Sequence, residues 1–149
     1  MAPNSYTELF FLDEVTALAA GHRPCFECRR QDALTFLNAY AEARQLETRP
    51  SAPEFDKVLH AHRLDGKAKR LVERPMASLP SGTMIEWRDA AWSVHGQSLL
   101  KWSFAGYTEK CAHAPRGTVR VITPLPMVET LRLGYNPLFH PSADKYVRA

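Results

Sequence analysis

The spacing of the apolar residues changes near Leu79, and this change constrains the fold more than any other feature of the sequence. Before it, apolar side chains recur at helical spacing. After it come three short stretches, at 83–88, 91–95 and 99–104, which each carry one tryptophan and are separated by turns. Such stretches are typical of antiparallel strands that pack on one face. Helices followed by a mostly antiparallel sheet and a C-terminal helix predict an α+β fold.

The helical part of the chain is predicted to contain three helices with recognisable end signals. Asp13 can cap the first helix, and Gly21 can supply its left-handed end. Ser51 and Glu54 have the spacing of a capping box for the third helix. The second helix is expected at 31–45 and the third at 53–64.

The sheet is predicted to have about four strands. A loop is expected at 106–117, and a fourth strand at 118–122. Thr123 should then cap a last helix that ends at Gly134. The tail 135–149 is rich in proline and polar residues, so we expect it to be extended.

The length fits a single domain, 1–149, with a helical part at 1–66, a sheet and last helix at 79–134, and the tail at 135–149. Hydrophobic residues make up 45 % of the chain, so a core can form without a disulfide or a metal. The net charge of +3 permits an acidic partner without requiring one. The apolar stretch 9–12 is far too short for a membrane span. An odd number of cysteines, three, favours a reduced, cytoplasmic chain over a disulfide framework.

The chemically distinctive segment is a Pro-Cys-x-x-Cys turn with Cys25 and Cys28. Two thiolates at this spacing can converge on one metal ion, and the amides of a following helix stabilise them. Zinc usually takes four ligands, so two more are needed. We predict Cys111 and His113 as the other two, which would make a Cys₃His zinc site; His22 is a further candidate because it is close in sequence.

Two other interpretations of this turn remain open. A redox dithiol of the thioredoxin kind would follow a strand, whereas a helix and Gly21 precede this turn. Alternatively, both cysteines are ordinary buried apolar residues.

Three arginines flank the turn, and basic residues beside a zinc module often contact phosphates. Arg23, Arg29 and Arg30 are therefore the predicted nucleic-acid contacts. The alternative, which we favour for these side chains, is a solvated face balanced by Glu27 and Asp32.

Most of the chain resembles an uncharacterised family of bacterial proteins. The resemblance is carried by YTELFFLDE at 6–14, TALAAGHRPC at 16–25 and CRR at 28–30, and by later segments around 58–60, 79–83, 102–107 and 134–143. The resemblance implies no activity. It implies that relatives carry more chain before the equivalent of Tyr6.

A shorter segment, 14–29, is similar to the second half of the zinc domain of Ada-type DNA alkylation-repair proteins. In that domain a short helix and a Gly-aromatic-Arg-Pro-Cys turn end a four-cysteine site. The resemblance implies that Cys25 and Cys28 are the latter pair of zinc ligands. The earlier pair has no counterpart, and His22 stands where the aromatic residue is usual.

These observations lead to three hypotheses. The first is a small zinc-stabilised binding protein that contacts nucleic acid. The second is a metal-assisted hydrolase or nuclease with His22, His60 or Asp56 as the general base. The third is a non-catalytic protein-interaction module that uses the tryptophan-bearing sheet, although the alternation predicts at least two tryptophans in the core.

Overall fold

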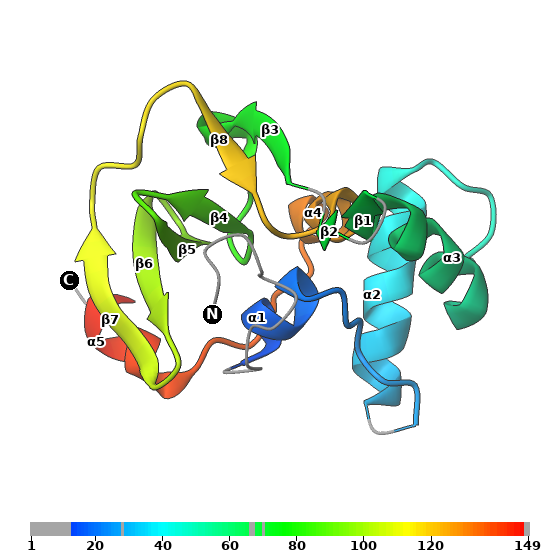
Figure 1. The fold of residues 1–149 in the computed structure, drawn as a ribbon. Helices are drawn as coiled ribbons and strands as arrows, with labels where there is room; N and C mark the ends of the chain where they lie inside the picture. Colours follow the sequence, from blue (N-terminus) through cyan, green and yellow to red (C-terminus); the bar gives the residue numbers. More distant parts are fainter. Residues whose placement is uncertain (1–12, 28, 66–67, 70, 148–149) are drawn as a thin grey trace.

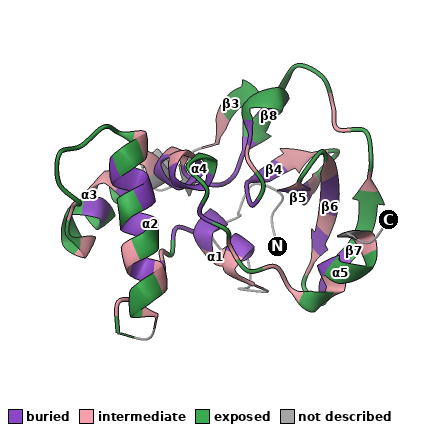
Figure 2. Cartoon of the chain, turned by 180° about the vertical axis from the view of Figure 1, so that it is seen from behind, coloured by how far each residue is buried: buried purple, intermediate pink, exposed green. Residues whose placement is uncertain are grey.

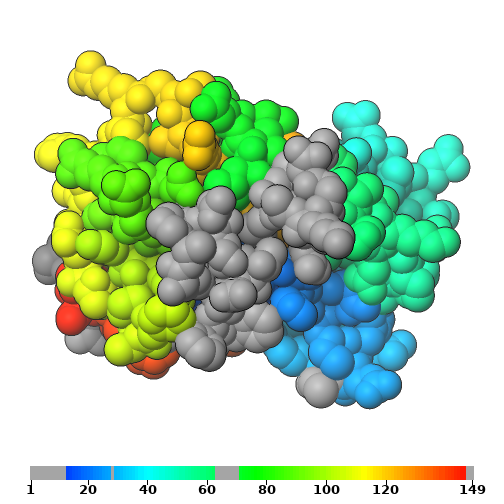
Figure 3. All heavy atoms as spheres, viewed as in Figure 1, coloured from blue at the N-terminus to red at the C-terminus, as the bar shows by residue number. Residues whose placement is uncertain are grey.

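The computed structural model describes residues 13–27, 29–65, 68–69 and 71–147, and it confirms the α+β class. The longest helices gather at one end of the molecule and the main sheet lies at the other (Figure 1). A space-filling view shows the same division, with α2 (Arg30–Ala43) and α3 (Ala52–Arg63) at one side of this face and strands of the main sheet at the other (Figure 3). No helix in these ranges is long and apolar enough to cross a membrane.

The helical end consists of three elements: α1 (Glu14–Ala19), α2 (Arg30–Ala43) and α3 (Ala52–Arg63). Asp13 caps α1, and Gly21 has a φ of 91°, as the sequence predicts. The capping box of α3 is also present, because Ser51 and Glu54 exchange backbone-to-side-chain hydrogen bonds of 3.0 and 3.2 Å. A short hairpin, β1 (Leu64–Asp65) and β2 (Ala68–Lys69), follows α3.

The main sheet is antiparallel and has six strands in the order β3-β8-β4-β5-β6-β7. Its strands are β3 (Val72–Pro75), β4 (Met84–Trp87), β5 (Ala90–His95), β6 (Ser98–Ser103), β7 (Gly106–Cys111) and β8 (Thr118–Val121). The turn between β4 and β5 has two central residues, Arg88 and Asp89, both at positive φ, as a tight hairpin requires.

Two of these strands, β3 and β7, are absent from the prediction of four strands. Both are edge strands, so each pairs with a neighbour on one side only. In β7 only Gly106 and Tyr107 are buried, and β3 has no buried residue. Neither strand therefore has the apolar alternation that marks a half-buried strand in a sequence.

The last helix also differs from the prediction at its start. Helix α4 (Leu125–Arg132) has Pro124 at its N-cap, not Thr123. The Thr123 hydroxyl instead accepts a hydrogen bond of 2.8 Å from the Met84 backbone N–H in the sheet. Thr123 thus satisfies a buried sheet amide rather than a helix end.

The sequence predicts an extended tail, but the tail is only partly extended. It forms a 3₁₀ turn, η3 (Pro141–Ala143), and a short helix, α5 (Asp144–Val147), beside β7. The His140 ring nitrogen Nδ1 accepts a hydrogen bond from the Ser142 backbone N–H, which caps this turn. Ala143 is fully buried against the sheet, so the tail is part of the core.

Helix α4 joins the two ends of the molecule. Met127 and Leu131 pack among the aromatic rings of α2 and α3, whereas Val128 packs against the sheet. In Figure 2, α1 and α4 are largely buried, and α2 shows a buried stripe beside an exposed one. The helical part and the sheet therefore share one continuous interior.

The tryptophans confirm the expectation that at least two lie in the core. Trp92 and Trp102 are buried, and Trp87 is half-buried with the Arg88 guanidinium 4.2 Å from its ring. A sheet with most of its tryptophans turned inward gives little support to an interaction module built on them.

We expect Gly106→Ala to destabilise the fold by about 1–3 kcal/mol more than a matched glycine substitution does. A Cβ at Gly106 would lie 2.8 Å from Ser142 Oγ, and φ is +144°. Gly117→Ala is the control, because φ there is +83° but nothing lies within 4 Å of the added Cβ. Urea unfolding of both variants measures the difference. Equal losses would show that the tail does not pack tightly on Gly106.

Candidate functional site

The site around the cysteine turn is built from the two carboxylates that begin α1. Asp13 accepts from the Thr16 backbone N–H at 2.9 Å, which closes the capping box of α1. The same carboxylate accepts from the Tyr107 hydroxyl at 2.7 Å and from the His140 backbone N–H at 2.8 Å. Asp13 therefore joins the start of α1 to β7 and to the tail.

Glu14 makes the connection to the end of the cysteine turn. Its side chain is only 6 % exposed and lies 2.9 Å from the Arg29 guanidinium. It also accepts from the Tyr135 hydroxyl and, at 2.8 Å, from the Leu138 backbone N–H. The hydrogen bond to Glu14 is the main cause that raises the pKa of Arg29, so this guanidinium is a permanent cation beside a buried carboxylate.

The cysteine turn lies between these anchors and α3. The Arg29 backbone N–H donates to the Cys25 carbonyl at 2.8 Å, which fixes the turn before α2. On the other side, Arg23 Nε and Nη2 donate to the Asp56 carboxylate on α3, at 2.8 and 3.0 Å, and Nη1 donates to the Pro24 carbonyl at 3.1 Å. The turn is thus held to α1 by one ion pair and to α3 by another.

This arrangement creates a pocket of about 350 Å³, which we call the cysteine pocket. It is lined by His22, Arg23, Cys25, Asp56, Leu59 and His60. Asp56 and His60 lie one helical turn apart on α3 and could contact each other, but the Asp56 carboxylate binds Arg23. A long-range pairing of this kind leaves no signal in the local spacing of residues.

Among the described residues, the structure does not bring Cys25 together with Cys111 and His113. Cys28 lies outside the described residues. Cys111 ends β7, where its side chain packs against the sheet core and its thiol contacts the His113 carbonyl at 3.2 Å. In Figures 1 and 2, that end of β7 lies on the opposite side of the molecule from the connection between α1 and α2.

His22 and His60, rather than Cys111 and His113, share the pocket with Cys25. Within the described ranges, however, no three His, Cys, Asp or Glu side chains are grouped closely enough to hold a metal ion. His22, Cys25 and His60 therefore line one pocket without forming a metal-binding group.

The three arginines predicted to bind nucleic acid each have a contact within the protein. Arg23 binds Asp56, Arg29 binds Glu14 and Asp32, and the Arg30 guanidinium lies 5.8 Å from the centre of the Phe26 ring. The predicted balance by Asp32 is confirmed for Arg29. Asp56, not Glu27, is the carboxylate that binds Arg23.

Comparison of the chain with protein-family models, with curated proteins and with solved structures finds no match. The two resemblances described above therefore remain predictions, and the function has to be inferred from the site itself.

We expect Glu14→Gln to lower the free energy of unfolding by about 2 kcal/mol, somewhat less than for a fully buried pair, because Arg29 is 34 % exposed. Asp32→Asn is the control, since Asp32 contacts the same arginine but is 48 % exposed. That variant should change stability by less than about 0.5 kcal/mol. Chemical unfolding of both proteins provides the comparison, and equal effects would contradict the importance of Glu14.

Two buried phenols predict a loss of stability at alkaline pH. Burial, followed by the neighbouring Asp13 charge, raises the pKa of Tyr107; burial, followed by the hydrogen bond to Glu14, raises that of Tyr135. The unfolded chain therefore releases these protons first. Their contribution is complete below the ordinary tyrosine pKa of about 10 and declines as the pH rises further.

The double variant Tyr107→Phe, Tyr135→Phe should be less stable at pH 8 but should lose less additional stability between pH 9 and 11. Urea unfolding at several pH values on either side of the ordinary tyrosine pKa of about 10 gives the slope of the unfolding free energy against pH. Tyr146→Phe, a substitution in α5, serves as the control. An unchanged slope in the double variant would show that these phenols are not the source of the alkaline loss.

Proposed function

We propose that this chain is a small zinc-stabilised binding protein, with the metal held at the cysteine pocket. The observation that carries this proposal is that Cys25 lines one pocket with His22 and His60. Thiolate and imidazole are the ligands that structural zinc sites use. Cys28, three positions after Cys25 in the sequence, supplies the second thiolate.

The proposed ligand set therefore keeps both cysteines of the turn and replaces Cys111 and His113 by histidines of the pocket. His22, Cys25 and Cys28 recur every third residue, so the turn brings three donors within one short segment. His60 approaches from α3, whose Asp56 is already bound to Arg23. In the structure His22, Cys25 and His60 are not close enough to share one ion, so zinc coordination would have to draw α3 and the turn together.

Zinc in this position would have a local structural role. The interior already contains three packed clusters of buried side chains, so folding does not depend on metal. Bound zinc would supply a fixed crosslink between the cysteine turn and α3.

The pocket offers weaker support for an enzyme. A metal-assisted hydrolase needs an open metal position and a general base close to it. Both oxygens of Asp56 accept from Arg23, and His22 and His60 are the proposed ligands. None of the three predicted general bases, His22, His60 and Asp56, is then free to act in the cysteine pocket.

Contact with nucleic acid through Arg23, Arg29 and Arg30 stays a prediction. Phosphates would have to compete with Asp56 for Arg23 and with Glu14 and Asp32 for Arg29. Arg30 is the arginine of the three for which no carboxylate contact is recorded among the described residues. The proposed zinc site therefore does not depend on phosphate contacts by these arginines.

Elemental mass spectrometry of untagged protein, purified without chelators, should find about one zinc ion per chain, as a single four-ligand site requires. Cys25→Ser should lose the metal, and His60→Asn should lower its content, because each removes a ligand. Cys111→Ser is the matched control and should retain zinc. Circular dichroism checks that each variant is folded.

Three outcomes would contradict this assignment. A parent protein without metal would remove zinc from the function. Retention of zinc by Cys25→Ser would place the metal elsewhere. Loss of zinc from folded Cys111→Ser would restore the Cys₃His set predicted from the sequence.

A further inference from the structure

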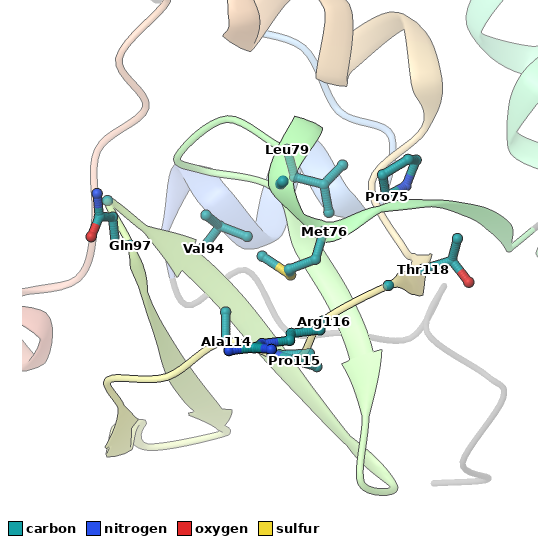
Figure 4. Close-up of a pocket in the computed structure, with 12 residues that line it drawn as sticks. Pro75, Met76, Leu79, Val94, Gln97, Ala114, Pro115, Arg116 and Thr118 are labelled. Atoms are coloured by element: carbon teal, nitrogen blue, oxygen red, sulfur yellow. The ribbon is translucent and has the colours of Figure 1, made fainter.

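A second pocket opens at one end of the sheet, and nothing in the cysteine turn contributes to it. Its walls come from β3 and η2 (Met76–Ser78), from the end of β5 and its following turn, and from the loop between β7 and β8 (Figure 4). We call it the sheet-end pocket. Its volume is about 760 Å³, which lies within the range of about 300–1,000 Å³ found for small-molecule sites.

The floor of the sheet-end pocket is apolar and is held in place by the sheet. Met76, Leu79 and Val94 are buried side chains of one core cluster, and Figure 4 shows them around the same space. The Met76 backbone N–H donates to the Gly117 carbonyl at 2.9 Å, which ties η2 to the facing loop. The Gly96 N–H donates to Ser81 Oγ at 2.8 Å and fixes the adjacent turn. The pocket is therefore largely preformed, which lowers the entropy lost on binding.

The charge of the lining is distinctive. Arg116 is the one charged residue among those that line the pocket, and no carboxylate accompanies it. Its side chain is exposed and lies beside Pro115 and Ala114 in Figure 4. No ion pair or hydrogen bond of Arg116 is recorded within the described part of the chain, whereas Arg23, Arg29, Arg44 and Arg120 all bind carboxylates.

We propose that the sheet-end pocket binds a small amphipathic monocarboxylate. The apolar body of the ligand lies against Met76, Leu79 and Val94, and its carboxylate binds Arg116. A guanidinium matches a carboxylate with two parallel hydrogen bonds. One cation balances one negative charge, whereas a dianionic phosphate head would keep an uncompensated charge beside apolar walls.

Isothermal titration calorimetry of the full chain with decanoate tests this site, and 1-decanol and decyl phosphate are compared as probes with the same apolar chain. Decanoate should bind most tightly. Arg116→Gln should weaken decanoate binding about tenfold, as expected for the loss of a charge-assisted hydrogen bond. Arg74→Gln is the matched control, because Arg74 is exposed on β3 but does not line the pocket, and it should leave binding unchanged.

A second variant tests the apolar part of the pocket. Ala114→Phe places a ring into the space beside Arg116 and should abolish decanoate binding while the far-ultraviolet circular dichroism stays unchanged. Absence of decanoate binding to the parent protein would overturn the proposal. So would equal binding of 1-decanol, tighter binding of decyl phosphate, or decanoate binding that both Arg116→Gln and Ala114→Phe leave intact.

Discussion

Two adjacent carboxylates, Asp13 and Glu14, connect more of this molecule than any other pair of side chains described. Asp13 receives donors from β7 and the tail, and Glu14 receives donors from Arg29 and again from the tail. A carboxylate as buried as Glu14 is tolerated only when it is fully partnered. The start of α1, the end of the cysteine turn and the tail must therefore take up their positions together.

This dependence explains how the cysteine pocket is formed. Arg29 is fixed by Glu14, which sets the end of the turn, and Arg23 is fixed by Asp56, which sets its distance from α3. Cys25 lies between Arg23 and Arg29 in the chain, His22 directly precedes Arg23, and His60 lies one helical turn beyond Asp56. Arg23 and Arg29, two of the predicted phosphate contacts, are thus part of the frame that forms the pocket.

Local patterns in the sequence predicted the α+β class, the helix cap at Asp13, the capping box at Ser51, and the burial of at least two of the three tryptophans. They did not predict the edge strands β3 and β7, whose side chains are mostly exposed and whose pairing depends on the backbone of a neighbour. Nor did they predict the Arg23–Asp56 contact, which joins residues 33 positions apart. The spacing of residues in the sequence identifies metal ligands that lie within one turn of the chain, and for this reason Cys25 and Cys28 are recognisable. The ligands that would complete a site come from other elements, and their positions depend on tertiary packing.

The two ionic anchors of the cysteine turn differ in strength. Arg29–Glu14 includes a carboxylate that is 6 % exposed, whereas in Arg23–Asp56 the side chains are 21 % and 49 % exposed. An exposed pair contributes roughly 0–1 kcal/mol, so α3 is held to the turn much less firmly than α1 is. His60 comes from α3, and the other proposed donors come from the turn. Zinc coordination between the turn and α3 would therefore reinforce the weaker of the two attachments. Bound zinc should slow the opening of α3 most and should affect the main sheet least, because the strands of that sheet pair independently of the turn.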